Sequence, residues 1–205
     1  RPGRFRGYAN LGAAYYRLNR YPEAISAFND SMNIRPNYQA ASNLGTILFF
    51  SGSYATAADA FRTALKFRDR DYRLWAYLAS SEKWAGRTAE AASAFRRSTE
   101  LAEESRRINP QDASLLGLLA DNYGSLGELE KTSTLLQQAL KMSPDDPALL
   151  FRAGVIYEHF FHDRARSFAL LSRALALGYD RAEIDRAPAL AEFRADPKFH
   201  SLQVK

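Results

Sequence analysis

Three histidines and a few acidic residues are the side chains of this 205-residue sequence that could bind a metal ion. His159 and His162 stand three residues apart beside Glu158 and Asp163. On a helix this spacing can place two imidazoles on one face, where they would bind a metal ion. No residue near the pair is a compelling third ligand. We therefore expect ordinary surface or packing histidines, and no metal site.

Paired carboxylates offer a second kind of chemistry, because two neighbouring acids can share proton-transfer work. The pairs are Glu103-Glu104 and Asp145-Asp146, but Asp146 before Pro147 is typical of a helix cap followed by a first-turn proline. The sequence has no cysteine, no Gly-rich phosphate-binding loop and no Gly-x-Ser-x-Gly elbow. We predict a protein that is not an enzyme and that holds no cofactor.

The composition indicates an ordinary globular chain, with 46% hydrophobic and 25% charged residues. No apolar run approaches the roughly 18 residues of a membrane span, and the first ten residues lack the apolar stretch of a signal peptide. We expect a soluble, cytoplasmic segment without a membrane span. Because Arg1 is no initiator, we also expect a piece of a longer chain.

The formal net charge is +5, and most of the basic residues are Arg. Arginine suits bidentate contacts to carboxylate or phosphate, so an acidic partner is one interpretation. The other is a solvated helical surface, which we favour for a small excess spread over the whole chain.

Small residues recur along the chain at a nearly constant spacing. Gly12, Gly45, Ala79, Ala120 and Gly154 are separated by 33, 34, 41 and 34 residues. A second column pairs a small residue with a large one four positions later: Ala24–Phe28, Ala57–Phe61, Ala91–Phe95 and Thr132–Leu136. Such a period predicts a stacked array of helical hairpins. Because four residues make about one helical turn, the small and the large residue of each pair lie on one face of the helix. We call the space left by a small residue a notch, and we expect each notch and its large neighbour to mark a close crossing of two helices.

The first unit nearly spells out the signature of the tetratricopeptide repeat, with Tyr8, Leu11, Gly12, Tyr15, Ala24, Phe28 and Pro36. The chain resembles this family over about residues 5–180. The resemblance implies an all-α fold, a right-handed α-solenoid of about five helical hairpins with a C-terminal helical cap. The expected divisions are 5–37, 38–71, 72–112 with an extended second helix, 113–146, a degenerate 147–180, and capping helices in 181–205.

Helix breakers predict a turn inside each hairpin, at Asn19-Arg20, Ser51-Gly52, Gly86, Gly127 and residues 161–163. The 41-residue interval holds seven extra residues, which we place on the second helix of the third unit. The added surface is Glu103, Glu104, Arg106 and Arg107. It is either a solvated extension or a docking ledge.

The sequence pattern changes after Gly178. Pro188 and Pro197 each suit the start of a short helix, and Asp196 suits the cap of the second. A solenoid must cover its terminal apolar face, and four residues could do this: Leu190, Phe193, Phe199 and Leu202. This tail resembles those that close tetratricopeptide arrays in bacterial multidomain signalling proteins.

The family resemblance implies a protein or peptide partner on the concave face that the first helices form. Counting from the aligned columns, we expect this face to carry Arg6, Asn10, Ala13, Arg17, Asn43, Thr46, Phe50, Arg73, Tyr77, Ser80, Lys83, Trp84 and Asp121. Arginines and amides among aromatics suit an acidic or C-terminal peptide. Phe50 and Trp84 fit inter-repeat packing as well as ligand contact.

The family's carboxylate clamp is matched only in part. Asn43 and Arg73 stand at clamp positions, whereas Ala9, Ala13 and Tyr77 replace the basic and amide residues that the clamp needs. A chaperone-tail receptor is therefore not expected.

We predict a non-catalytic protein–protein interaction scaffold within a larger bacterial regulatory protein. The alternative is a homo-oligomerisation module, which would self-associate. Nucleic-acid binding ranks third and is not expected, because Arg is interspersed with Glu and Asp and the sequence contains no known nucleic-acid-binding motif.

Overall fold

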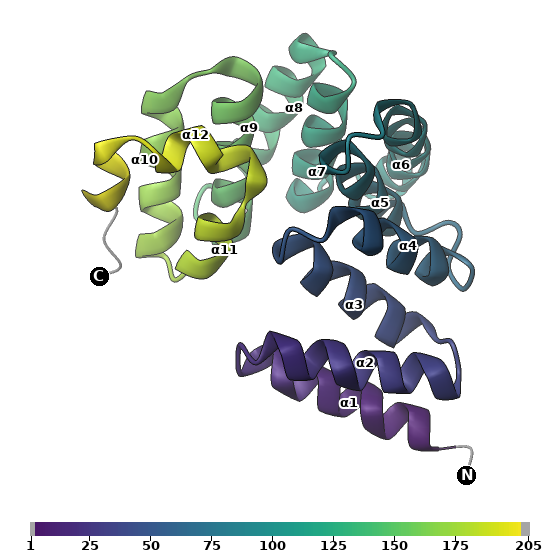
Figure 1. Ribbon diagram of the computed structural model, residues 1–205. Coiled ribbons are helices and arrows are strands. Elements are labelled where there is room, and N and C mark those ends of the chain that lie inside the picture. Colours follow the sequence, from purple (N-terminus) through teal and green to yellow (C-terminus); the bar gives the residue numbers. More distant parts are fainter. Residues whose placement is uncertain (1–2, 202–205) are drawn as a thin grey trace. The chain divides into compact units, whose positions relative to one another are not determined.

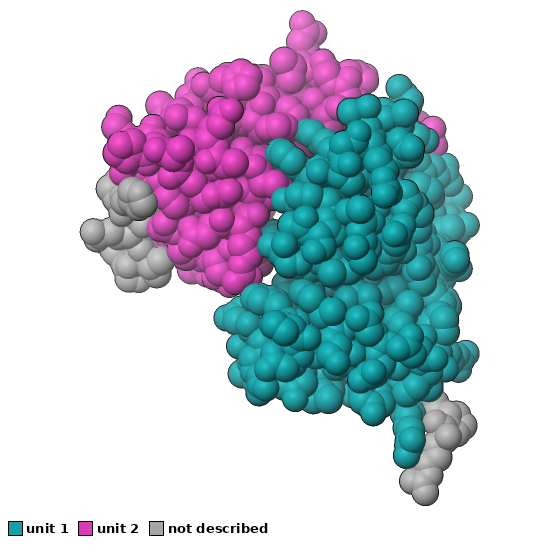
Figure 2. Space-filling model, viewed as in Figure 1, with its two compact units in different colours: residues 1–98 teal, residues 99–205 magenta. Residues whose placement is uncertain are grey.

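The computed structural model describes residues 3–201, with their side chains as far as Phe199, and all regular structure in this range is helical (Figure 1). The chain forms two compact units, residues 1–98 and 99–205 (Figure 2). The predicted all-α fold of consecutive helical hairpins is confirmed. Within the described range, no helix is long and apolar enough to cross a membrane.

Unit 1 contains two complete hairpins and most of a third. Its helices are α1 (Arg4–Arg17), α2 (Tyr21–Ile34), α3 (Tyr38–Phe50), α4 (Tyr54–Leu65), α5 (Tyr72–Trp84) and the first half of α6 (Thr88–Ile108). The hairpin turns lie where breakers predicted them, and they pass through positive φ at Asn19 (57°), Gly52 (80°) and Gly86 (79°). Side-chain caps begin α3 and α5, each of which is the first helix of its hairpin. The Asn37 side chain accepts a hydrogen bond from the Ala40 amide, and the Asp71 carboxylate accepts hydrogen bonds from the Arg73 and Leu74 amides.

Close helix crossings explain the small residues of the repeat. A Cβ on Gly12 would stand 2.7 Å from Phe28 ring atoms, and a Cβ on Gly45 would stand 2.8 Å from the Phe61 ring. Both phenylalanines are fully buried. The predicted notch and large neighbour are thus confirmed in the first two hairpins, where the first helix can approach the second only without a side chain.

Helix α6 has 21 residues, whereas α2, α4, α8 and α10 have 12 to 14. Its C-terminal half belongs to unit 2 and packs on α7 (Ala113–Ser125), where the Tyr123 hydroxyl donates to the Glu103 carboxylate at 3.1 Å. Burial and the nearby Glu103 charge raise the pKa of Tyr123. Arg106 pairs with Glu103 at 3.5 Å, and Ile108 is 88% exposed. The extension therefore has one packed side and one solvated side.

Unit 2 continues with α7, α8 (Leu129–Met142), α9 (Pro147–Phe161) and α10 (Arg164–Ala176). The notch of its last hairpin is Gly154, where a Cβ would stand 2.7 Å from Leu171. A further notch is Gly124, which faces the Phe160 ring. The predicted cap at Asp146 is confirmed, since its carboxylate accepts from the Ala148 and Leu149 amides.

Short helices close the C-terminal end of unit 2. They are α11 (Arg181–Arg186), a 3-10 turn (Pro188–Leu190), α12 (Ala191–Arg194) and a second 3-10 turn (Pro197–Ser201). Asp196 caps the last turn by accepting from the Lys198 amide. The predicted covering residues Leu190, Phe193 and Phe199 are buried in one cluster with α10 residues such as Leu171. Leu202 lies outside the described residues.

Candidate functional site

The two histidines that could have shared a metal ion do not lie on one helical face. Helix α9 ends at Phe161, and His162 follows it in the left-handed region with φ of 54°. His159 packs against the Phe160 ring, with ring centroids 4.8 Å apart. Among residues 3–199, no group of three His, Asp or Glu side chains is arranged to hold a metal ion.

The predicted binding residues of unit 1 come from three first helices that lie next to one another, because α1 contacts α3 and α3 contacts α5. We call them the first-helix face: Arg6, Asn10, Arg17, Asn43, Thr46, Phe50, Arg73, Tyr77, Ser80, Lys83 and Trp84. Five are exposed, namely Arg6, Asn10, Arg17, Arg73 and Tyr77, and the other six are half-buried. Every member therefore reaches solvent.

Three arginines of this face, Arg6, Arg17 and Arg73, have no carboxylate partner among residues 3–199, and Arg6 lies 5.7 Å from the centre of the Phe5 ring. All three side chains are exposed. Arg20 is different, because its guanidinium donates to Glu23 at 2.8 Å and that hydrogen bond lowers the pKa of Glu23. The guanidinium of Arg73 lies 5.0 Å from the Tyr72 ring, a contact that leaves its donors open to an anionic ligand.

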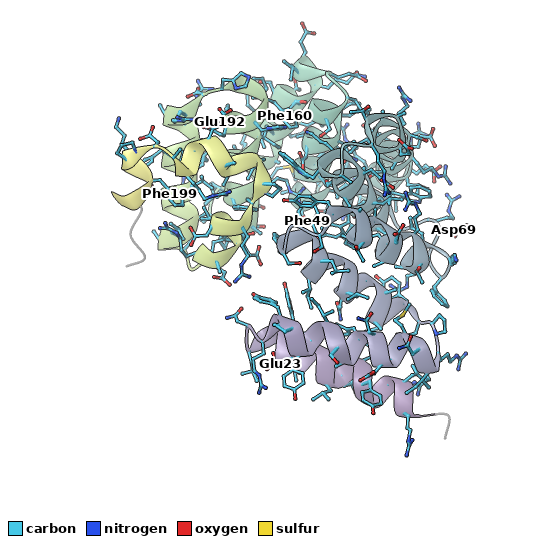
Figure 3. All side chains as sticks on the ribbon, viewed as in Figure 1. Glu23, Phe49, Asp69, Phe160, Glu192 and Phe199 are labelled. Carbon is cyan, nitrogen blue, oxygen red and sulfur yellow. The ribbon has the colours of Figure 1, made fainter. Side chains whose placement is uncertain are left out.

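Aromatic rings line the turn end of the hairpins in unit 1. The Phe49 ring contacts Phe50 at 5.6 Å and Tyr54 at 5.4 Å between centroids, and Tyr54 lies 6.3 Å from Trp84. We call Phe49, Phe50, Tyr54 and Trp84 the aromatic row. Phe49 lies at the same end of the unit as Glu23, and Asp69 lies at the opposite end (Figure 3). Trp84 thus packs against Tyr54 of the preceding hairpin, as one interpretation held, whereas Phe50 contacts the ring of Phe49 in its own helix; both side chains are half-buried.

Two further members of the face are held by their own surroundings. The Tyr77 ring stacks on the buried Phe61 ring at 5.4 Å with an interplanar angle of 12°, and Tyr77 is still 47% exposed. The Thr46 hydroxyl donates to the Ser42 carbonyl of its own helix at 3.1 Å. Its proton is therefore not available to a ligand, while Tyr77 presents one fixed ring face.

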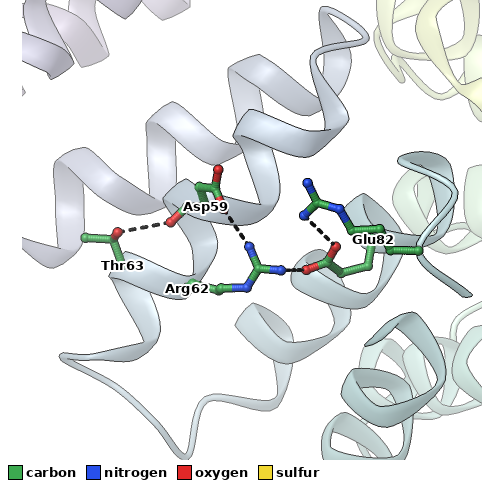
Figure 4. A network of polar contacts seen from close by, with 5 residues as sticks. Asp59, Arg62, Thr63 and Glu82 are labelled. Atoms are coloured by element: carbon green, nitrogen blue, oxygen red, sulfur yellow. Dashed lines mark hydrogen bonds and ion pairs between the residues drawn. The ribbon is translucent and has the colours of Figure 1, made fainter. Parts of the chain in front are cut away.

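A buried glutamate of α5, Glu82, joins this helix to α4, and the sequence analysis did not predict it. The Glu82 side chain is 2% exposed and accepts hydrogen bonds from Arg62 of α4 and from Arg87 at 3.2 Å (Figure 4). Arg62 also donates to Asp59 at 2.6 Å. A signal was present, because Glu82 stands in the repeat column that elsewhere holds Tyr15, Leu48, Tyr123 and Tyr157. A charge in an aromatic and aliphatic column requires a partner.

Replacing Glu82 with alanine should lower the free energy of unfolding by about 1–3 kcal/mol, because two charge-assisted hydrogen bonds disappear from a buried site. The loss stays moderate, since Arg62 and Arg87 are each about 40% exposed and can be hydrated. Urea denaturation followed by circular dichroism measures the change. The matched control is Glu90→Ala, an exposed position of α6, and equal stabilities for the two variants would contradict a structural role for Glu82.

Asp121, the remaining residue predicted for the binding face, lies in unit 2 and is described with that unit. It lies on α7 in unit 2, half-buried, and pairs with Arg152 of α9 at 3.5 Å. Its carboxylate is thus compensated within unit 2.

The positive charge is not spread over the chain, and our expectation of an even distribution was wrong. Residues 1–98 hold 15 Lys and Arg against 7 Asp and Glu, a net charge of +8. Residues 99–205 hold 13 against 16, a net charge of −3. Unit 1 therefore carries the whole basic excess of the protein, and its surface favours anionic groups.

Sequence models of the tetratricopeptide repeat match residues 5–38, 42–113 and 113–146. A comparison with curated protein sequences found no match. Solved structures share the fold. TTC0263 of Thermus thermophilus, a thermophilic tetratricopeptide repeat protein, is 21% identical with a TM-score of 0.63, over 91% of this chain and 98% of that one.

Two other solved structures are similar over most of their length. Pseudomonas aeruginosa pilF is 14% identical with a TM-score of 0.57, over 97% of this chain and 92% of that one. YrrB, described as a tetratricopeptide repeat protein with an unusual peptide-binding site, is 18% identical with a TM-score of 0.51, over 85% of this chain and 86% of that one. At these identities the likeness concerns the fold alone.

Proposed function

Because the chain belongs to the tetratricopeptide repeat family, we propose that it is a non-catalytic scaffold that binds an acidic segment of a partner protein. The binding surface is the first-helix face of unit 1. The observation that carries this proposal is the pair of exposed arginines, Arg17 and Arg73, which lack carboxylate partners among residues 3–199.

The chemistry of the face selects a carboxylate-bearing ligand. Each guanidinium can donate two parallel hydrogen bonds to one carboxylate, and the half-buried Asn43 amide can donate to a peptide carbonyl. The net charge of +8 on unit 1 also steers an acidic segment toward this surface before contact.

The aromatic row provides the apolar part of the recognition. Phe50 contacts Phe49, and Trp84 contacts Tyr54, so both side chains are already held in place. They therefore lose little conformational entropy when a ligand binds to their solvent-exposed edges. Tyr77 adds a ring face that Phe61 holds in place. We therefore propose an acidic segment that also carries aliphatic or aromatic anchors.

We further propose that this scaffold is part of a larger bacterial regulatory protein and acts in the cytoplasm. This proposal rests on the resemblance of the closing residues after Gly178 to those of bacterial signalling proteins.

A capture experiment from native extract tests the proposed function. The wild-type chain is compared with the Arg17→Glu/Arg73→Glu variant and with Lys66→Glu/Arg96→Glu, which changes the net charge equally at exposed positions outside the face. The expected result is a protein retained by the wild type and the control variant but lost by the first variant. Retention of the same proteins by all three would overturn the proposal.

Two additions to this experiment exclude the other functions. Nuclease treatment of the extract removes partners that are bridged by nucleic acid. Light scattering reports self-association: a wild-type dimer that the Arg17→Glu/Arg73→Glu variant loses would make the face an oligomer interface and would overturn partner binding.

A further inference from the structure

Exposed arginines of unit 1 recur at the end of the hairpins that lies opposite the aromatic row. The loops that join one hairpin to the next, residues 35–37 and 66–71, both lie at this end (Figure 1). Arg35 follows the turn residue Asn19 at the same distance in sequence as Arg68 follows Gly52, so the two arginines occupy one repeat position. Both are exposed, and neither pairs with a carboxylate among residues 3–199. We call residues 34–38 and 66–73 the loop edge.

An aromatic ring holds each of these two arginines. The guanidinium carbon of Arg35 lies 5.4 Å from the centre of the Phe5 ring, and that of Arg68 lies 3.9 Å from the centre of the Tyr38 ring. A guanidinium that lies over a ring keeps the N–H donors at its edge available for an anion. Arg68 is exposed although a complete hairpin precedes its own, so this exposure does not depend on where the repeat array begins.

Unit 2 has neither part of this arrangement. By the repeat spacing, the ring position holds Ala113 and Pro147, and the arginine position holds Ser143 and Gly178. The ring-held arginines therefore belong to the unit that has a net charge of +8.

A large apolar side chain precedes each arginine of the pair. Ile34 is 47% exposed, and Phe67 is 49% exposed. Leu177 of unit 2 occupies the same repeat position and is 43% exposed, but Gly178 follows it. Exposed apolar side chains at this position thus occur in both units, whereas an arginine beside them is specific to unit 1.

The loop edge is basic as a whole. Five basic residues stand against two acidic ones, Asp69 and Asp71, which leaves a net charge of +3: Arg35, Lys66, Arg68, Arg70 and Arg73. The Asp71 carboxylate already accepts from two backbone amides as the cap of α5. The edge therefore attracts anionic groups.

The side chains of the edge suit a lipid surface better than a nucleic acid. Base stacking needs an open ring face, but Arg35 and Arg68 lie over rings that are half-buried, and the aliphatic Ile34 has no ring. A large apolar side chain beside a cation is typical of segments that bind the membrane interface. There the apolar group enters the headgroup region and the cation meets lipid phosphates.

We propose that the loop edge of unit 1 binds the surface of an anionic membrane. Arg35 and Arg68 donate to lipid phosphate groups, while Ile34 and Phe67 enter the headgroup region. This site is distinct from the first-helix face, with which it shares Arg73 alone.

Co-sedimentation of the full chain with lipid vesicles tests this proposal, at about 0.15 M salt so that long-range attraction is screened. The vesicles contain phosphatidylcholine alone or phosphatidylcholine mixed with phosphatidylserine. We expect binding to the mixed vesicles and none to phosphatidylcholine alone. Arg35→Glu/Arg68→Glu should weaken this binding at least about tenfold. Arg17→Glu/Arg96→Glu changes the net charge equally at exposed positions outside the loop edge and should weaken it less than about threefold.

A second matched pair measures the apolar contribution. Phe67→Ala should weaken vesicle binding at least about threefold, because less apolar surface enters the headgroup region. Leu177→Ala, at the equivalent position of unit 2, should leave binding unchanged. Circular dichroism shows whether all variants keep the helicity of the wild type.

Several results would overturn the proposal: no binding to the mixed vesicles, binding that survives Arg35→Glu/Arg68→Glu, or equal losses within either matched pair. The same holds if single-stranded oligouridine binds the chain while the vesicles do not, and Arg35→Glu/Arg68→Glu abolishes that binding. The loop edge would then be a nucleic-acid site.

Discussion

Replacing Phe61 with alanine is expected to lower the free energy of unfolding by about 3–5 kcal/mol, the largest effect on stability that we predict. The Phe61 side chain is fully buried, fills the notch over Gly45 and supports the Tyr77 ring. Its removal leaves a cavity where two helices cross and removes one of the contacts that join the second hairpin to α5. The first-helix face should then lose its fixed Tyr77 ring as well.

Urea denaturation followed by helical circular dichroism measures this loss, and Phe67→Ala is the matched control. Phe67 is 49% exposed just beyond α4, so its truncation should change the free energy of unfolding by no more than about 0.5 kcal/mol. Equal destabilisation by the two substitutions would contradict the packing that the repeat columns predict.

Reversing the charges of Arg17 and Arg73, two of the three arginines of the first-helix face, is expected to reduce affinity for the acidic partner segment by at least about 100-fold. Each of Arg17 and Arg73 contributes a charge-assisted hydrogen bond worth about 1.5–3 kcal/mol, and a glutamate in its place adds repulsion. Stability should change little, because both side chains are exposed and neither pairs with a carboxylate among residues 3–199.

Isothermal titration of the captured segment against the wild type and Arg17→Glu/Arg73→Glu measures this change. The Lys66→Glu/Arg96→Glu control separates local contacts from the general field, since it alters the net charge of unit 1 by the same amount. We expect less than about a threefold loss in the control, from weakened long-range attraction alone. Similar losses in both variants would show that charge alone, and not this face, determines binding.

The sequence was sufficient to predict the features that depend on local spacing. The close crossing at Gly12 and Phe28 follows from two small-residue columns that recur in each repeat, and the turn at Gly52 follows from a glycine between two amphipathic patterns. Asp146 could be recognised as a cap because its partners are the next few amides. Each of these features is determined by residues within a single hairpin.

Features that depend on side chains meeting between neighbouring hairpins were not predicted. Tyr77 was placed on the binding face, but its stacking on Phe61 joins α5 to α4 and has no local signature. Glu82 was missed because its partner Arg62 is 20 residues away in the preceding helix. Such contacts are decided by packing, which repeat columns do not encode.

Hydrogen exchange of the wild-type chain with and without its captured partner segment tests the central claim most directly. We predict new protection in the first helices of unit 1, centred on residues 6–17, 43–50 and 73–84, because these backbones lie under the bound segment. Protection confined to the second helices α2, α4 and α6, or to unit 2, would contradict binding at the first-helix face.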